Sequence, residues 1–452
     1  MKIKKISVES LFGIFNHEIT LNTGDGITII IGENGLGKTV ILESINAFFD
    51  ERYHFFSDLE FSNFRFYFDN GDVWELTKKN DDGNTALFIS KDSTLKPARR
   101  IKTHKIYLED NISNKTYRGN NLSDFMTLKE RERTLHRKLA MESGQSQTIN
   151  NSEKEFHRQA LARELFIREI YNKQLDLDIP MWFVEGIKKV NVQLIETQRI
   201  ITAKESGSDS YVNNLNKCSK ELKEMIDTAT KESSLVSSLL DSTYPNRLVR
   251  KLRQGNVDSF EDLNIALAKL DERRKKFSDA GLSVKISDSD LLQIDENQRN
   301  LVNVLKLYID DSHQKLDPYQ DLLEKILLFK RIINKRFKHK TLQVSRDDGL
   351  YFQSTVISDA KNEYAIIPHT KLSSGEQHEL ILFYKLIFNA KPNELILIDE
   401  PELSLHISWQ NKFINDLKDV TSINHIYIVI ATHSPDIIDE NWDLKVELKG
   451  IE

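Results

Sequence analysis

One eight-residue stretch, GENGLGKT at residues 32–39, limits what this chain can fold into more than any other feature. It follows the β-branched run ITIII and precedes KTVILESINAFF, whose apolar residues have the spacing of an amphipathic helix. The stretch matches the pattern G-x-x-x-x-G-K-[ST] in the strand-to-helix context that this pattern requires. A buried strand, a glycine-rich loop and a helix are therefore expected in this order.

The residue types in this loop point to a nucleoside triphosphate. Glycines let backbone N–H groups curl around phosphate oxygens, and the start of a helix adds the positive end of its dipole. Lys38 can reach the β and γ phosphates, and the hydroxyl of Thr39 can bind Mg²⁺. A glycine-rich turn that caps a helix by chance would explain neither the lysine nor the strand before it. The predicted ATP-binding residues are Gly32, Glu33, Asn34, Gly35, Leu36, Gly37, Lys38 and Thr39.

A second stretch, ELILIDEPE at residues 394–402, has the pattern of an apolar strand that ends in two acids. Asp399 stands at the carboxyl end of this strand, where a carboxylate can hold the Mg²⁺ shell. Glu400 follows it and can orient and deprotonate an attacking water. Acids at a strand end are often merely solvated, but together with the phosphate loop they predict a metal ligand and a general base.

The sequence LSSGEQ at residues 372–377 precedes the apolar helical pattern HELILFYKLIF. Ser373, Ser374 and Gly375 form a small-residue loop at a helix start, which suits a phosphate. Because the γ-phosphate on Lys38 already has its own loop, this second site is best explained if it closes over nucleotide held by another subunit. A simple N-cap, with Glu376 and Gln377 nearby, is the alternative.

Two further residues are candidates for catalysis. His433 ends the buried strand pattern IVIATHSP, where its ring could hydrogen-bond the γ-phosphate and so distinguish ATP from ADP. A lone histidine at a strand end also fits a structural role. Gln198, in LIETQR, ends a strand between the phosphate loop and LSSGEQ, where it could reach the metal and the attacking water. Glutamines at strand ends are common.

Composition limits the class of protein. The chain has 452 residues, 39% hydrophobic and 29% charged, which is enough for a large core and more than one compact unit. No apolar run approaches the roughly 20 residues that span a bilayer, and MKIKKISVES is not a signal peptide, so we expect a cytoplasmic protein with no membrane partner. The single cysteine, Cys218, excludes intrachain disulfides. A net charge of −6 argues against wholesale coating of nucleic acid.

The patterns along the chain predict three parts. Residues 1–205 combine the phosphate loop with alternating runs such as FRFYFDNGDVWELT, which predict an antiparallel β lobe. Residues 206–339 have long, charged helical patterns. Residues 340–452 begin with a hairpin pattern and then alternate helix and strand, so both ends of the chain are expected to share one sheet.

The helical part has two informative features. Its last helix carries one apolar stripe, formed by Leu322, Ile326, Phe329, Ile333 and Phe337. The segments TYP and RQGN are expected to break its helices. A short helical hairpin or bundle is therefore expected rather than a long uninterrupted coiled coil.

In this order, the phosphate loop, TQ, LSSGEQ, LILIDEPE and ATHS resemble the Walker A, Q-loop, signature, Walker B and H-loop motifs of an ABC-type ATPase head. More narrowly, the chain resembles the RecF, SMC and OLD branch of AAA-family ATPases. Within that branch, the motifs DEPELSLH and ATHSP resemble the corresponding motifs in the ATPase subunits of bacterial anti-phage systems of the Septu PtuA or PARIS AriA type. The resemblance implies an α/β fold, an ABC-type P-loop ATPase head with an antiparallel β lobe and a helical, short coiled-coil-like insertion.

The resemblance also implies how the motifs are used. Two heads would sandwich two ATP molecules with Mg²⁺, each nucleotide bound by Lys38 of one subunit and by Ser373 to Gly375 of the other. A D-loop at Ser404, Leu405 and His406 would contact the opposite subunit. The chain departs from the transporter pattern, in which an aspartate is usual at His406 and a glycine at Ser374. Both departures leave the rate of hydrolysis open, because the contacts in trans set it.

Two functions remain open. The helical insertion disfavours a transporter subunit, and residues 434 to 452 are too few for the Toprim nuclease domain that an OLD-type protein carries after its ATPase. The favoured function is a sensor and scaffold of an anti-phage complex. It would form a homodimer or larger homo-oligomer, respond to DNA or a phage protein, and control a separate effector nuclease.

The alternative is a RecF- or SMC-like DNA-repair ATPase that clamps DNA. The modest insertion and the absence of a Cys-x-x-Cys hook disfavour it. A basic cluster, formed by Arg273, Arg274, Lys275 and Lys276, could contact phosphate, although charge runs on helices are usually solvated faces.

Overall fold

The computed structural model describes most of the chain in two compact units. The described residues are 1–81, 84–94, 103–106, 180–195, 201–202, 212–253, 260–282, 301–358, 364–368 and 371–450. Unit 1 comprises residues 1–21, 32–192 and 446–452, and unit 2 comprises residues 22–31 and 193–445. Each unit therefore contains segments from both the beginning and the end of the chain.

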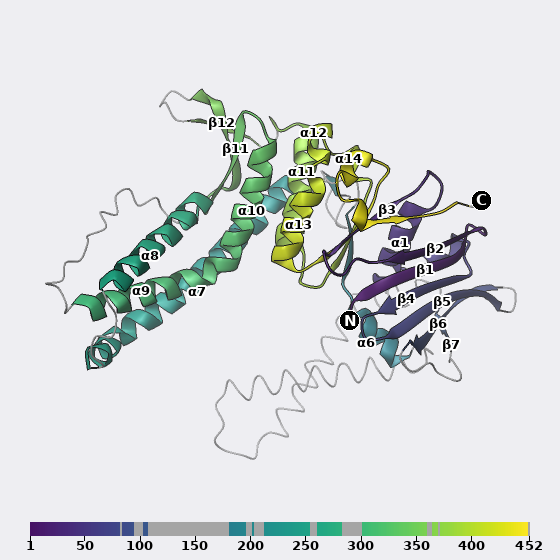
Figure 1. The fold of residues 1–452 in the computed structure, drawn as a ribbon, viewed down its shortest axis with the longest axis horizontal. Coiled ribbons are helices and arrows are strands. Elements are labelled where there is room, and N and C mark those ends of the chain that lie inside the picture. The colour runs from purple at the N-terminus through teal and green to yellow at the C-terminus, as the bar shows by residue number, and fades with distance from the viewer. Residues whose placement is uncertain are drawn as a thin grey trace, which may run out of the picture. The chain divides into compact units, whose positions relative to one another are not determined.

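Unit 1 is built on a six-stranded sheet with the order β2-β1-β4-β5-β6-β7 (Figure 1). Its strands are β1 (Ile3–Leu11), β2 (Phe15–Thr20), β4 (Asn63–Phe68), β5 (Asp72–Asp81), β6 (Asn84–Ser93) and β7 (Thr103–Ile106). All neighbouring pairs are antiparallel. In β4, Phe64, Phe66 and Phe68 are buried and alternate with more exposed residues, as one-sided packing requires. The predicted antiparallel β lobe is confirmed.

Helix α1 (Lys38–Phe49), which begins within the phosphate loop, packs on this sheet through aromatic rings. Phe48 stacks on Phe66 with ring centroids 4.6 Å apart. It also lies 5.7 Å from Phe183 of α6 (Met181–Ile187), measured between ring centroids. The short helix α2 (Phe55–Asp58) follows α1. Because four rings from four elements meet here, with Trp74 of β5 as the fourth, the last turn of α1 is held by an aromatic core.

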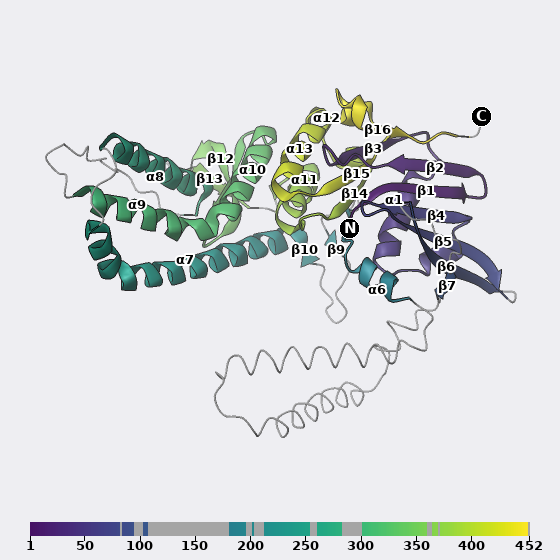
Figure 2. The ribbon, with the colours of Figure 1, turned by 60° about the horizontal axis from the view of Figure 1, so that its bottom comes forward.

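The second sheet has five strands in the order β16-β3-β15-β14-β8. Figure 2 labels β16, β3, β15 and β14 of this sheet. They are β3 (Ile27–Ile31), β8 (Val192–Ile195), β14 (Leu395–Asp399), β15 (Tyr427–Ala431) and β16 (Lys445–Glu447). β3 and β14 both pair with β15 in parallel. Their apolar runs are buried residue after residue, as in parallel strands covered on both faces. The prediction that both chain ends share one sheet is confirmed.

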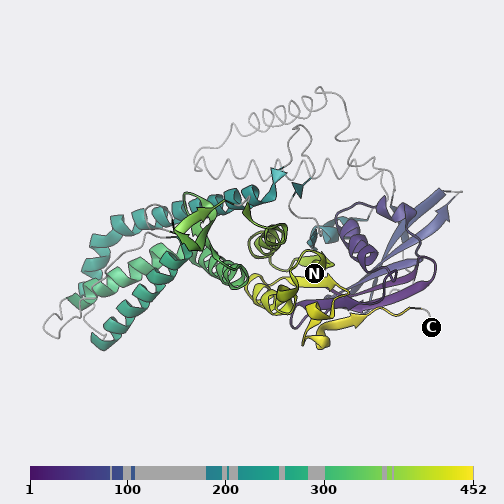
Figure 3. The same cartoon turned by 90° about the horizontal axis from the view of Figure 1, so that it is seen from above.

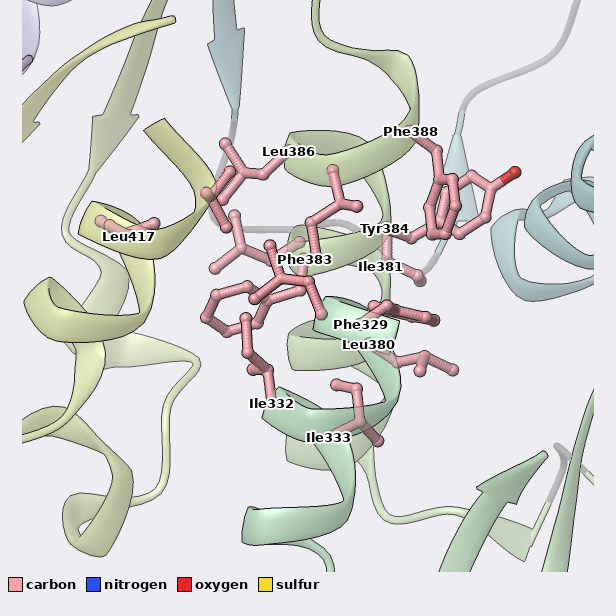
Figure 4. Close-up of a cluster of buried hydrophobic side chains, with 14 of the residues drawn as sticks. Phe329, Ile332, Ile333, Leu380, Ile381, Phe383, Tyr384, Leu386, Phe388 and Leu417 are labelled. Carbon is pink, nitrogen blue, oxygen red and sulfur yellow. The ribbon is translucent and has the colours of Figure 1, made fainter. Parts of the chain in front are cut away.

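The main core of unit 2 lies between this sheet and the helices packed on it (Figure 4). The elements are α10 (Gln320–Arg336), α11 (Ser374–Tyr384), the π-helical turn η4 (Lys385–Asn389) and α13 (Phe413–Asn424). The predicted stripe of α10 faces this core: Ile326, Phe329, Ile333 and Phe337 are buried, and Leu322 packs at the edge. The remaining short elements are β9 (Ile201–Thr202), β10 (Val212–Asn213), η5 (Pro401–Leu403), α12 (Ile407–Gln410), α14 (Pro435–Ile438) and η6 (Trp442–Leu444).

The helical insertion is a bundle of α7 (Asn214–Arg253), α8 (Phe260–Ala280) and α9 (Val302–Leu316), joined to α10 by η2 (Asp317–Tyr319) (Figure 3). α9 packs against both α7 and α8, and Leu263, Leu270, Val302 and Ile309 form a small core of their own. Among the described helices, none has both the length and the apolar character that a bilayer span needs. The predicted insertion is therefore a packed bundle.

The predicted break at TYP is wrong, because α7 continues through Pro245 to Arg253. Proline removes one backbone N–H from the ladder. Side chains add bonds to the turn just before it: Thr243 Oγ1 donates to the carbonyl of Leu239, and the guanidinium of Arg247 donates to that of Leu240. Arg247 also pairs with Asp311 of α9. Tertiary contacts thus keep a helix that local propensity disfavours.

A three-stranded antiparallel sheet follows α10, with the order β11 (Lys340–Ser345), β12 (Gly349–Ser358) and β13 (Tyr364–Ile367). The predicted hairpin corresponds to β11 and β12, whereas the sequence did not predict β13 or β2. Asn334 of α10 bonds both the N–H and the carbonyl of Leu342, which fixes β11 to the end of α10. The chain passes from β13 to the LSSGEQ segment.

A buried charge cluster joins three helices of unit 2. The guanidinium of Arg336 on α10 pairs with Glu379 on α11 and with Asp416 on α13, and it lies over the ring of Phe383. All three charged residues are less than one-tenth exposed. Burial lowers the pKa of Arg336, and the neighbouring Asp416 opposes that shift. The cluster ties the end of the insertion to the helix that follows LSSGEQ.

We expect Arg336→Leu to destabilise unit 2 by about 3–5 kcal/mol, because it leaves two carboxylates buried without a cation. The matched control is Arg331→Leu on the same helix, whose partner Asp419 is 46% exposed, and it should cost less than about 1 kcal/mol. Urea unfolding followed by tryptophan fluorescence measures both. Equal losses in the two variants would contradict a structural role for the cluster.

Candidate nucleotide site

The phosphate loop of unit 1 has the backbone geometry of an anion cradle. Gly35 and Gly37 both have φ of +88°, a left-handed conformation that favours glycine. Gly37 is the N-cap residue of α1, yet no side chain caps this helix and no acid lies in its first turn. A helix start that lacks a side-chain acceptor is suited to an anion.

Lys38 is only 5% exposed, and its ammonium is held inside the loop. Its Nζ donates to the carbonyl oxygens of Gly32, at 2.9 Å, and Glu33, at 3.0 Å. A buried cation needs such partners. The loop therefore holds a positive charge beside the start of α1, and this donor set fits the phosphates of ATP.

Three residues that support the loop were missed by the sequence reasoning. The ring of His17 on β2 bonds the carbonyl of Leu36 through Nε2, at 2.9 Å, and burial lowers the pKa of His17, so the ring is neutral near pH 7. Leu11 and Phe12, at the end of β1, lie against Gly37, where an added Cβ would come within 2.7 Å and 3.1 Å of them. No local sequence signal marks such contacts, because they depend on the fold of the β lobe.

In unit 2, the parallel pairing brings the predicted acidic strand end beside β3. Asp399, the last residue of β14, is aligned with Ala431 of β15, and Ala431 is aligned with Ile30 of β3. β3 ends at Ile31, one residue before the phosphate loop begins. Carboxyl ends of parallel strands meet at one edge of a sheet, so Asp399 lies at the edge from which the loop departs.

Glu400 and His433 lie together at this edge. Glu400 has a φ of +39°, and its N–H donates to the carbonyl of Ala431. The Nε2 atom of His433 is 3.5 Å from Oε1 of Glu400, and both side chains are about one-third exposed. A strained, partly exposed glutamate beside a histidine is the arrangement expected of a general base with a neighbouring polar group.

Glu402, the second glutamate of DEPE, is another residue that the sequence reasoning did not assign. Its Oε1 accepts from the hydroxyl of Thr432 and from the N–H of His433, both at 2.8 Å. Ser434, next in the chain, bonds Gln410. Glu402 therefore holds the segment of His433 against the segment of Glu400.

The LSSGEQ loop forms the N-cap that its sequence allowed. Ser373 and Glu376 make a complete capping box: the N–H of Ser373 donates to Oε2 of Glu376 at 2.9 Å, and the N–H of Glu376 donates to the hydroxyl of Ser373 at 3.4 Å. Ser373 and Ser374 nevertheless remain exposed. The N-cap interpretation is thus confirmed for the free chain, and the phosphate interpretation stays a prediction.

The predicted D-loop lies beside this loop within unit 2. A Cβ on Gly375 would lie 3.9 Å from the carbonyl oxygen of Ser404. Leu403 and Ile407, which flank Ser404 to His406, are 69% and 67% exposed. His406 caps α12 by accepting from the N–H of Ser408 through Nδ1, a role that an aspartate oxygen also fills. The two loops form one exposed face, which we call the signature face (residues 373–375 and 403–407).

Two other predictions have different outcomes. Gln198 lies outside the described residues, so its roles in metal binding and catalysis stay predictions. Cys218 is buried on α7, and burial together with Glu221 raises the pKa of its thiol to about 12. At neutral pH this thiol is therefore protonated and unreactive.

Comparison with known proteins gives a family and several weaker likenesses. A family model described as "AAA ATPase domain" matches residues 1–438. The chain is similar to "Protein ea59" of Escherichia phage lambda, with 33% identity over 70 residues, which are 16% of this chain and 13% of that protein. Seventy matching residues leave most of both chains uncompared.

Solved structures of SMC head domains are also similar to this chain. One from Pyrococcus furiosus, bound to the C-terminal domain of ScpA, has 13% identity and a TM-score of 0.33, over 97% of this chain and 91% of that chain. One from Thermotoga maritima has 10% identity and a TM-score of 0.33, over 100% and 96%. TM-scores this low carry no argument, and the fold described above follows from the strand order itself.

We expect Gly37→Ala to destabilise the nucleotide-free protein more than Gly35→Ala does. Both substitutions put alanine at the same positive φ, which costs about 1–2 kcal/mol. Only the Cβ at position 37 meets neighbours, one of which, Leu11, is fully buried, whereas nothing lies within 4 Å of a Cβ at position 35. Overpacking should add about 1–3 kcal/mol. Thermal unfolding without nucleotide measures the difference, and equal losses would mean that the β lobe does not hold the loop.

Proposed function

The chain belongs to the AAA ATPase domain family, and on that premise we propose that it binds and hydrolyses ATP at sites shared by two copies of itself. One observation carries the proposal. The exposed serines of LSSGEQ and the D-loop lie together on the signature face, flanked by two exposed large apolar side chains. A surface of that kind is suited to a protein partner.

The charges of the described residues support this arrangement. Lys38 is already held by two carbonyls of its own loop and can turn to the β and γ phosphates of ATP. In trans, the start of α11 adds backbone N–H groups and a positive dipole end at Ser373 to Gly375. A nucleotide held between them would connect the two copies only while its γ-phosphate is present. ATP binding would therefore favour the pair, and hydrolysis would release it.

We propose the remaining roles from the sequence motifs and, for Glu400 and His433, from their contact at the end of the parallel strands. Mg²⁺, where bound, supplies charge neutralisation of the phosphates, and Thr39 and Asp399 are the residues that would hold it, with Gln198 a further prediction. Glu400 would accept the proton of the attacking water. His433, beside Glu400 and fixed by Glu402, would hydrogen-bond the γ-phosphate.

We further propose that this ATP-driven pairing serves anti-phage defence, with a separate nuclease as the effector. The support is the similarity of two motif sequences, DEPELSLH and ATHSP, to those of anti-phage ATPase subunits. The alternative is a DNA clamp, and the contacts of the basic cluster in the insertion weaken the support for it. Arg273 bonds His313, Asp317 and Gln320, and Arg274 bonds Tyr308 and Ser312, so both arginines join α8 to its neighbours.

Mixing two inactive variants tests whether the sites are shared. Lys38→Ala lacks the cradle and Ser373→Arg lacks the trans contact, so neither should hydrolyse ATP alone. In a mixed pair, one site combines an intact Lys38 with an intact Ser373, and we expect about a quarter of the parent ATPase activity after random exchange. The matched control replaces Ser373→Arg by the double variant Lys38→Ala/Ser373→Arg, which forms no intact site. Activity no higher than in this control would refute shared sites.

Native mass spectrometry of the protein co-purified with the products of its own operon tests the defence proposal. We expect the homo-oligomer to carry a second polypeptide with nuclease activity, in a stoichiometry that changes on addition of ATP. Lys38→Ala is the control, because its complex should not respond to ATP. A homo-oligomer that carries bound DNA and no second polypeptide would instead favour the DNA clamp.

A further inference from the structure

Lys340, the first residue of β11, forms an ion pair with the glutamate of LSSGEQ. Its Nζ lies 2.9 Å from Oε1 and 2.9 Å from Oε2 of Glu376. Both side chains are largely buried, at 17% and 13% exposure. Oε2 of Glu376 also accepts the N–H of Ser373. The lysine, the glutamate and the serine thus form one continuous set of contacts that ends at the signature face.

The backbone around Lys340 is fixed. Asn334 of α10 bonds both backbone groups of Leu342, and the N–H of Thr355 on β12 donates to the carbonyl of His339. Lys340 is aligned with Ser354 in the β11–β12 pair. The fixed backbone of β11 therefore limits where the ammonium of Lys340 can lie.

The charge of Glu376 is a problem for the proposed trans site. A carboxylate three residues from Ser373 repels the γ-phosphate that the same loop must approach, and partial burial strengthens this repulsion. The capping box needs an oxygen at this position but does not need the negative charge, because an N–H bonds a neutral amide oxygen as well. Lys340 supplies the opposite charge, in contact with both carboxylate oxygens of Glu376.

We propose that Lys340 is a positioning residue for the nucleotide contact in trans, because it neutralises Glu376 and holds the capping box of Ser373. The inference rests on the proposed function, since it concerns the same shared site. It also links the end of the insertion to the signature face through Glu376, because β11 is fixed to the end of α10 and Glu376 bonds Ser373.

The test measures ATP-dependent self-association by analytical ultracentrifugation in a Glu400→Gln background, which removes the proposed base and so prolongs the ATP-bound state. Lys340→Met should raise the protein concentration for half-association about tenfold, whereas Lys340→Arg should keep the parent value. The double variant Lys340→Met/Glu376→Gln should recover most of the loss. Lys276→Met is the matched control, because it removes a lysine from an exposed ion pair with Glu272.

Two further measurements separate a local effect from misfolding. Binding of a fluorescent ATP analogue at concentrations below self-association reports the Lys38 cradle alone, and it should change less than about twofold in Lys340→Met. Glu376→Gln, which needs no change at Lys340, should associate at least as well as the parent. A tenfold loss in Glu376→Gln would overturn the charge argument even if Lys340→Met failed to fold.

The outcomes for the inference and for the proposed function differ. Lys340→Met that associates like Lys276→Met, or a double variant as impaired as Lys340→Met, would overturn the inference alone. Ser373→Arg in the same assay reports the proposed function, because it blocks the trans contact directly. Parent-like association of Ser373→Arg would overturn the shared site itself.

Discussion

The parallel pairing of β3 with β15 is the constraint on which the site depends. It aligns Ile30 with Ala431, residues from opposite ends of the chain, and the pairing of β15 with β14 then aligns Asp399 with the same Ala431. Main-chain hydrogen bonds fix this register, and burial of Ile29, Ile398 and their neighbours on the core face prevents a one-residue slip. Asp399, Glu400 and His433, at the ends of β14 and β15 within unit 2, take their positions from that register.

Backbone strain and buried charge occur in the motifs and in the helices packed beside them. Glu400 has a positive φ that a non-glycine residue adopts at a cost, and Gly37 has one that only glycine tolerates beside Leu11. Lys38 is a buried cation held by carbonyls, and Arg336 is a buried cation held by carboxylates. Surrounding structure must stabilise such features, and the two apolar cores supply that stability.

Local patterns predicted much of this structure, and tertiary contacts decided the rest. The phosphate loop, α1, the hairpins and the stripe of α10 follow from glycine placement and from apolar periods of 3.6 or 2, which a single sequence displays. The course of α7 through Pro245 depends on Arg247 and its partner on α9, residues that no local rule connects. Glu402 and His17 escaped prediction for the same reason: each acts through a backbone group distant in sequence.

One of the two departures from the transporter motifs, His406, has a structural explanation. His406 offers Nδ1 to the same helix start that an aspartate would cap, so the D-loop keeps its shape with one negative charge fewer. The pairing of Glu376 with Lys340 removes a second negative charge from the neighbouring loop. Because His406 lies in the signature face and Glu376 caps its other loop, both contacts lower the negative charge beside the proposed phosphate site and keep the backbone geometry. Such a surface can bind the nucleotide of a partner subunit while the γ-phosphate is present and release that subunit when the γ-phosphate is lost.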